Sequence, residues 1–309
     1  MKKFILTSFI IFMVFVFDTE LLNDTAVNLY YKINDSNTKK IISNKELLNK
    51  NEYYKESLSS YFKDYDEFVV HNKEELMNAY YTAINNGYEG LTFYCDKSYT
   101  DCSNDINILD NDEEFFSYIN QLVHVYNSYE TIKSTYSSNL RVDITIERKY
   151  NKSDIEKIDN ELMRLIEILN INNFSSVDEK IKAFHDYLAN SNTYDQVRAD
   201  TGTSDYNSDT AIGTLFQGKS ICSGYTDAMA LFLDKLNLTN TRIASDKHVW
   251  NAVLINGEWK HIDLTWDDPI VSDGSNVVLY NYFLIDTDTL STRKDTEHDI
   301  NKTVYDFIK

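Results

Sequence analysis

Proline and glycine are scarce in this 309-residue chain, which contains one proline and eight glycines. So little proline excludes proline-rich linkers and segments that bind partners as polyproline II helices. The sequence has neither a phosphate-binding loop nor the glycine pattern of a dinucleotide-binding fold. It also has no C-x-x-C or H-E-x-x-H pair, and its acidic clusters lack the spacing and the glycine of a calcium loop. The sequence therefore predicts no cofactor and no bound metal.

Positive charge is scarce as well. The chain has 30 lysines and arginines against 49 aspartates and glutamates, for a formal net charge of −19. An acidic surface repels phosphate backbones, so nucleic acid is excluded as a partner. Apolar residues make up 42% of the chain, enough to bury a core, and the length allows two domains.

The N-terminus begins MKKFILTSFIIFMVFVF, with two lysines before an uncharged apolar run over residues 4–17. This pattern is typical of a signal peptide, and the run is short for a complete membrane span. We predict that residues 1–20 are a signal peptide or an N-terminal membrane anchor. No A-x-A cleavage site follows, so both possibilities stay open. The protein is expected to be exported, either extracellular or held at the cell surface by residues 4–17.

Three cysteines are present, and export changes how they are interpreted. Cys95 and Cys102 lie close enough in CDKSYTDC to close a small disulfide loop in an oxidising compartment, or to remain two free thiols. Cys222 has no obvious partner. An unpaired cysteine in an exported protein indicates either pairing between molecules or a reactive thiol.

The first half of the chain predicts a small α/β module over residues 21–150, whose role no motif indicates. Residues 21–64 are polar and predict a solvated stalk with one short helix within 44–58. Beyond them the periodicity predicts alternating strands and helices. The strands are expected at 67–72, 88–95 and 140–150, and the helices at 73–87 and within 113–133.

The second half, residues 151–309, predicts helices followed by strands, an α+β arrangement. Two helices carry capping-box patterns, Ser153 with Glu156 and Ser176 with Glu179. An exposed loop is expected over 195–210. Asn256–Gly257 is a strong hairpin signal between two of the strands. Strands are expected at 241–245, 248–255, 258–266 and 277–285.

Cys222 is predicted at the N-terminal end of a helix that continues through YTDAMALFLDKL. The positive pole of a helix favours a thiolate, and its unpaired N–H groups can hold an oxyanion. His248 heads the strand before the Asn256–Gly257 turn, and Asp263 lies on the strand after it. The two are nearly equidistant from the turn, so they are expected to lie close together, within a slip of two residues. The three residues fit a nucleophile, its base and the carboxylate that orients the base.

Each of these residues also has a structural interpretation. Cys222 could be a small buried hydrophobe, and a single strand histidine such as His248 is commonly structural. His261 shares a face with Asp263 and is the alternative base. The other candidates are Gln217 as an oxyanion donor, His185 and Tyr194 as cleft or packing residues, Asp267 and Asp268 in the turn before Pro269, and Tyr225, Trp250 and Trp266 as apolar walls.

The ordered blocks GKSICSGYTDAMALFLDKL, HVWNAVLI and EWKHIDLTWDDP resemble the transglutaminase-like superfamily, in particular its bacterial exported members. The resemblance covers about residues 152–298. It implies a papain-like or transglutaminase-like core, in which a helix that carries the cysteine packs on an antiparallel sheet that carries the histidine and the aspartate. It places the nucleophile at Cys222, the base at His248 and the orienting carboxylate at Asp263. Ser223 and Val249 depart from the residues common in the family.

Together these features predict a cysteine-dependent acyl-transfer enzyme that acts on peptide or glutamine carboxamide bonds through a thioester. Its expected partners are peptide or protein substrates, with cell-wall peptides among them. Hydrolysis and transfer to an amine both remain open. The alternative is a catalytically silent surface module of the same fold that binds wall peptides or partner proteins. The sequence does not indicate an oligomeric state.

Overall fold

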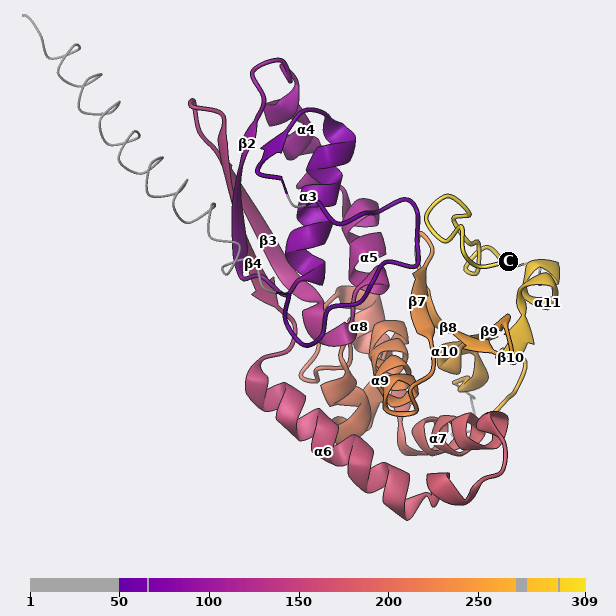
Figure 1. The fold of residues 1–309 in the computed structure, drawn as a ribbon. Coiled ribbons are helices and arrows are strands. Elements are labelled where there is room, and N and C mark those ends of the chain that lie inside the picture. Colours follow the sequence, from indigo (N-terminus) through magenta and orange to yellow (C-terminus); the bar gives the residue numbers. More distant parts are fainter. Residues whose placement is uncertain (1–49, 66, 271–276, 294) are drawn as a thin grey trace, which may run out of the picture. The chain divides into compact units, whose positions relative to one another are not determined.

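The computed structural model describes residues 50–309 except 66, 271–276 and 294 (Figure 1). The predicted export segment and residues 21–49 of the predicted stalk lie outside the described residues. Within the described part, no helix has the length and apolar character needed to cross a membrane. Lys50–Lys309 form one compact unit.

The first sheet contains four strands in the order β1-β2-β4-β3. β1 and β2 are parallel and are joined by α3, whereas the other pairs are antiparallel. α3 begins where the Asn72 side chain accepts a hydrogen bond from the Glu75 N–H, and it ends just before Gly87, which has a φ of +77°. The elements of this half are β1 (Val69–Val70), α3 (Lys73–Asn85), β2 (Gly90–Cys95), α4 (Cys102–Leu109), α5 (Glu113–Leu122), the 3₁₀ turn η2 (Val125–Asn127), β3 (Tyr129–Tyr136) and β4 (Arg141–Arg148).

Two elements of this half differ from the sequence-based expectation. The helix predicted within 113–133 ends at Leu122, and the strand β3 follows from Tyr129. YETIKSTY is rich in β-branched and aromatic residues, which favour a strand. The short helix α4 was not predicted. Cys95 and Cys102 form a disulfide with a Cα–Cα distance of 6.2 Å, which joins the end of β2 to the start of α4.

The described part of the predicted stalk packs against the fold. Residues 50–58 contain no helix, so that part of the expected helix is wrong. Phe62 is 1% exposed and belongs to the hydrophobic core. The Ser59 hydroxyl donates to the Val304 carbonyl. Residues 50–64 are therefore held by apolar burial and by contacts with the C-terminal segment.

The helices of the second half follow the predicted pattern with two corrections. α6 is capped by Asn151 and Asp154, two residues before the predicted pair. α7 has the predicted capping box of Ser176 and Glu179. The expected loop over 195–210 contains a short helix, α8. The elements are α6 (Lys152–Ile168), the 3₁₀ turn η3 (Ile171–Asn173), α7 (Val177–Ser191), β5 (Thr193–Tyr194), α8 (Gln196–Thr201), the π-helix η4 (Gly213–Gln217), β6 (Lys219–Ser220) and α9 (Cys222–Lys235).

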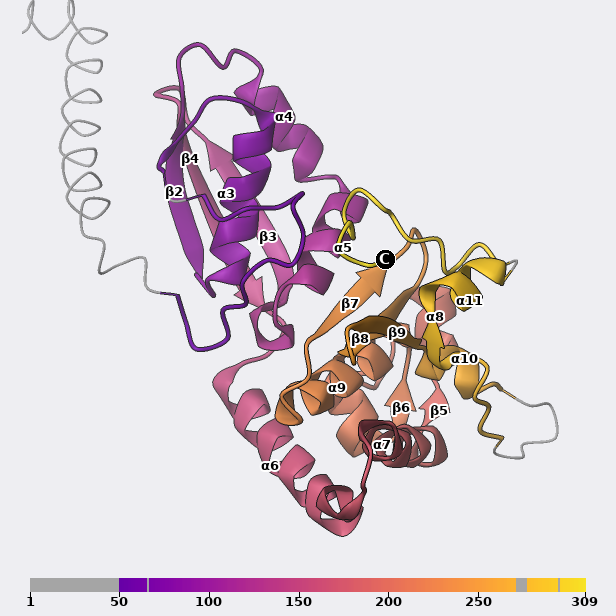
Figure 2. The same cartoon turned by 45° about the vertical axis from the view of Figure 1, so that its right-hand side comes forward.

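The second sheet is antiparallel, in the order β10-β9-β8-β7, and α9 packs against β7 and β8 (Figure 2). Asn256 and Gly257 both have positive φ, as a two-residue hairpin turn of this kind requires. The strand predicted over 258–266 ends at Ile262, because Asp263 caps a short helix. The elements are β7 (Asn240–Ala244), β8 (Val249–Ile255), β9 (Glu258–Ile262), α10 (Leu264–Asp267), β10 (Phe283–Asp286) and α11 (Thr287–Thr292). The α+β class, with the cysteine helix against an antiparallel sheet, is confirmed.

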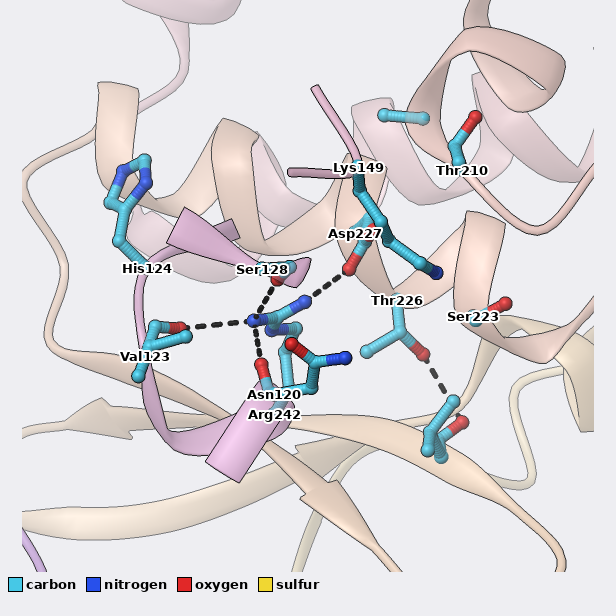
Figure 3. A network of polar contacts seen from close by, with 12 residues as sticks. Asn120, Val123, His124, Ser128, Lys149, Thr210, Ser223, Thr226, Asp227 and Arg242 are labelled. Carbon is cyan, nitrogen blue, oxygen red and sulfur yellow. Dashed lines mark hydrogen bonds and ion pairs between the residues drawn. The ribbon is translucent and has the colours of Figure 1, made fainter. Parts of the chain in front are cut away.

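A buried arginine connects the two halves (Figure 3). Arg242 of β7 is 3% exposed and forms an ion pair with Asp227 of α9. The same guanidinium donates to the carbonyls of Asn120 in α5 and of Val123 just after it, and to the hydroxyl of Ser128, which directly precedes β3. The domain boundary at residue 150 stays a prediction, and the polar contacts of Arg242 run across it.

Candidate active site

Cys222 begins helix α9 and is the one cysteine outside the disulfide. The residue is partly exposed. The N-cap residue, Ile221, has no polar side chain, so no side chain caps the first turn. Gly224 fits this turn against the preceding loop, because a Cβ there would lie 2.3 Å from the carbonyl oxygen of Ser208. Close backbone packing therefore fixes the position of the helix start.

Side-chain hydrogen bonds fasten the first turns of α9 to strand β8. The Thr226 hydroxyl donates to the Val249 carbonyl at 3.1 Å, and the Asn251 amide donates to the Thr226 carbonyl at 3.0 Å. Thr226 appears in Figure 3 beside the Arg242 network. Because Val249 directly follows His248, these bonds hold the cysteine helix close to the residue predicted as its base.

His248 and Asp263 lie in direct contact, with 2.6 Å between Nε2 and Oδ2. Asn251 pairs with Ile262 in the hairpin, so the position opposite Asp263 is Trp250. His248 is two residues before Trp250 and reaches Asp263 diagonally, within the expected slip of two. Both side chains are almost completely buried.

Electrostatic interactions favour a protonated His248. Burial lowers its pKa, but the charge and hydrogen bond of Asp263 and the interaction with the Cys222 sulfur outweigh burial and raise the pKa to about 10. Because Nε2 faces Asp263, Nδ1 is the nitrogen left for Cys222. Burial raises the pKa of Asp263, but the contacts with His248 and His298 outweigh burial and hold the pKa well below its usual range. A thiol beside an imidazolium whose other nitrogen is held by a carboxylate can act as a nucleophile. The catalytic roles themselves stay a prediction.

A second histidine contacts the same carboxylate, and the sequence analysis missed it. His298 Nε2 lies 2.7 Å from Oδ2 of Asp263, and its Nδ1 lies 2.6 Å from Oδ1 of Asp295. The ring stacks on Tyr282 with 4.6 Å between the centroids. The Asp-x-x-His spacing of residues 295 and 298 is the only local signal, and it does not indicate a partner 35 residues earlier.

His248, Asp263 and His298 each offer a metal-ligand atom, and these atoms lie within 4.8 Å of one another. Both imidazole nitrogens, however, lie 2.6–2.7 Å from a single carboxylate oxygen. Ligands of a tetrahedral zinc ion, each about 2 Å from the metal, are separated by roughly 3.3 Å. The three side chains are therefore spaced as hydrogen-bond partners.

Two predicted alternatives for site roles have other partners. Gln217 is exposed, and its Oε1 accepts a hydrogen bond from the Asn207 N–H at 2.8 Å. His261 accepts from the Trp250 indole at Nδ1, at 3.1 Å. Burial, and then the charge of His298, lower the pKa of His261 to about 4. A neutral, buried and hydrogen-bonded His261 is not positioned to act as a base.

The second pair of acidic residues also has specific partners. Asp267 accepts from the Tyr282 N–H at 3.0 Å, and its other oxygen lies 3.3 Å from Nε2 of the buried His185. Asp268 accepts a hydrogen bond from the buried Tyr225 hydroxyl. Both carboxylates therefore anchor neighbouring elements in addition to forming the turn.

Aromatic side chains surround the site. Trp250 is 1% exposed and stacks on His248 at 6.0 Å, and Trp266 contacts His298 at 5.3 Å. Tyr194 of the short strand β5 pairs with Ser220 of β6, and Ser220 lies two residues before Cys222. Burial, and then the charge of Cys222, raise the pKa of Tyr194 to about 12. Tyr194 therefore belongs to the surroundings of the thiol.

No protein-family model matches the chain, and no curated protein sequence matches it. Among solved structures it is similar to a TGase (a transglutaminase), with 17% identity over 48% of each chain and a TM-score of 0.34. It is also similar to a protein from Cytophaga hutchinsonii described as a candidate cysteine protease. That likeness has 14% identity, covers 49% of this chain and 65% of that chain, and has a TM-score of 0.28. The chain thus spans about half the length of the TGase.

Proposed function

We propose that this protein is a cysteine-dependent acyl-transfer enzyme that acts on peptide bonds or glutamine carboxamides of peptides and proteins. The observation that carries the proposal is the position of His248. One ring nitrogen is bound by the buried carboxylate of Asp263, and the other is left for the unpaired thiol of Cys222. This is the arrangement that a thiolate nucleophile, its base and an orienting carboxylate require.

In the proposed reaction the Cys222 thiolate attacks the carbonyl carbon and forms a tetrahedral intermediate. The uncapped N–H groups of the first turn of α9 are suited to hold its oxyanion. His248 then donates its proton to the departing amine, or to ammonia from a glutamine, as the C–N bond breaks and a thioester remains. Water or a substrate amine attacks the thioester and loses a proton to His248, which frees the thiolate. Attack by water gives hydrolysis, and attack by an amine gives a cross-link.

We further propose that the enzyme acts outside the cell membrane, where the disulfide between Cys95 and Cys102 would be stable. Residues 4–17 would direct export or tether the protein to the membrane. Cell-wall peptides are substrates that fit this location. The alternative of a silent binding module predicts the same fold but an unactivated thiol.

Thiol reactivity tests the proposal without a known substrate. At about pH 6, alkylation of Cys222 in folded protein should be faster than that of glutathione, because an imidazolium beside a thiol favours the reactive thiolate. His248→Ala should abolish this advantage, whereas His71→Ala, at an exposed surface histidine, should retain it. Equal rates for the wild type and His248→Ala would leave only the binding module.

The reaction class requires a second experiment. The wild type and Cys222→Ala would be incubated with cell-wall peptides, and separately with a glutamine peptide and a labelled amine. Cleavage that depends on Cys222 indicates a hydrolase, and amine incorporation indicates a transferase. An acyl adduct on Cys222 in the mass spectrum would identify the thioester.

A further inference from the structure

His298 has an acceptor for each of its ring nitrogens. Nε2 faces Oδ2 of Asp263 at 2.7 Å, and Nδ1 faces Oδ1 of Asp295 at 2.6 Å. The His298 side chain is 2% exposed, so water does not compete freely for either nitrogen. An ionised carboxylate oxygen can only accept hydrogen bonds. A hydrogen on Nε2 therefore lets the ring donate to Asp263.

The carboxylate of Asp263 uses all its acceptor sites. Oδ1 accepts from the N–H groups of Thr265 at 2.9 Å and Trp266 at 3.3 Å. Oδ2 receives His248 at 2.6 Å and His298 at 2.7 Å. Two oxygens offer about four lone-pair directions, and all of them are occupied. The carboxylate cannot turn without losing hydrogen bonds, and its negative charge is shared between two imidazoles.

We propose that His298 is a positioning residue for the Cys222–His248–Asp263 arrangement, because it donates to the carboxylate oxygen that also holds His248. It would fix this carboxylate and weaken the hold of Asp263 on the His248 proton. The inference rests on the proposed function, in which His248 has to carry a proton and then release it to the departing amine. Acid–base catalysis is most efficient when the proton is held neither too firmly nor too weakly. Sharing the oxygen between two donors serves this purpose.

The surroundings hold the His298 ring in place. It stacks on Tyr282 and packs against Trp250 and Trp266 at centroid distances of 5.0 and 5.3 Å. The Ser245 hydroxyl donates to the carbonyl of Glu297 at 2.6 Å, which ties the segment to the turn before His248. The titratable groups that face the ring are Asp263, His248, His261, Tyr282 and Asp295. His261 stays neutral, so the charges that act directly on His298 are those of the two carboxylates and His248.

The test compares the pH dependence of Cys222 alkylation in the wild type and in variants of residue 298. Each rate would be measured after a rapid jump in pH, before the fold can respond. The rate changes where His248 loses its proton and the ion pair ends. His298→Phe and His298→Met remove the donor to Asp263 and keep an apolar side chain in the aromatic pocket. A hydrogen bond to a charged group is worth roughly one unit of pKa. In both variants the pH at which the alkylation rate changes should therefore rise by about one unit.

His298→Gln is the matched control, since its amide nitrogen can occupy the place of Nε2 and still donate. It should keep a pH dependence close to that of the wild type. Nitrogen NMR of the wild type gives a second measurement that needs no variant, and we expect hydrogen on Nε2 of His298, the nitrogen that faces Asp263. An unprotonated Nε2 would overturn the inference, as would an unchanged pH dependence in either folded donor-less variant.

The two proposals fail in different ways. A wild-type thiol that reacts no faster than glutathione would remove the proposed function and with it the inference about His298. If the wild-type thiol is activated but the pH dependence of alkylation is unchanged in His298→Phe or His298→Met, only the inference about His298 fails. Circular dichroism of each variant, recorded at neutral pH, ensures that only folded protein is compared.

Discussion

Replacing Arg242 with methionine should remove a large part of the protein's stability. Its side chain is 3% exposed, and its guanidinium is paired with Asp227. Removing one partner of a buried ion pair costs about 3–5 kcal/mol, because the other charge stays buried without compensation. The carbonyls of Asn120 and Val123 and the hydroxyl of Ser128 also lose a donor. We expect a loss of at least about 3 kcal/mol from a total that is typically about 5–15 kcal/mol.

Urea unfolding followed by tryptophan fluorescence measures this loss. Arg242→Lys is the matched control, which keeps the charge but not the planar fork, and it should lose less. Asp227→Asn, combined with Arg242→Met, completes a double-mutant cycle, and the double variant should lose less than the sum of the two single losses. A loss below about 1 kcal/mol for Arg242→Met, or strictly additive losses, would refute the reasoning. Hydrogen exchange over residues 113–136 should rise together with that of α9, since the same side chain contacts both.

Three further predictions concern the site and the disulfide. Because the pKa of His248 is raised from 6.5 to about 10, the folded protein keeps a proton that the unfolded chain releases. This contribution to stability should be complete below about pH 6.5 and lost as the pH rises towards 10. In urea unfolding, the free energy of unfolding of His248→Gln should therefore depend less on pH over this range than that of the wild type. Gly224→Ala should slow Cys222 alkylation by displacing the helix start, because its Cβ would lie 2.3 Å from the Ser208 carbonyl oxygen; an unchanged rate would contradict this role. Replacing Cys95 and Cys102 together with serine should cost about 2 kcal/mol relative to the disulfide-bonded wild type, the loop-closure value for so short a loop, measured by urea unfolding; the reduced wild type should unfold like the variant.

Local patterns allowed much of the fold to be predicted. The capping box of Ser176 and Glu179 and the Asn256–Gly257 turn depend on residues within a few positions of one another. The hairpin then sets which residues of its two strands lie close together, so the contact between His248 and Asp263 could be predicted from distances to the turn. Periodicity likewise placed the helix that begins at Cys222.

Errors arose where short-range patterns were ambiguous or where tertiary contacts decide. Asn151 and Ser153 are both good N-cap residues, and the choice between them depends on where the preceding strand ends. The apolar pattern did not show that Asp263 would cap a helix and end strand β9. The burial of Arg242 and of His298 depends on partners more than 30 residues away in sequence, which periodicity in a single chain does not reveal.

The position of His298 so late in the chain has a consequence for the order of events during synthesis. Cys222 leaves the ribosome before the rest of the site. His298, which donates to Asp263, is synthesised 35 residues after that aspartate. The segment that carries this donor packs against β7, where the Ala244 N–H donates to the Tyr305 hydroxyl oxygen at 2.8 Å. In a nascent chain Cys222 would therefore be present before His298 can form its hydrogen bond to Asp263. The pH dependence of the thiol would then reach its final form only after the C-terminal segment has packed against β7.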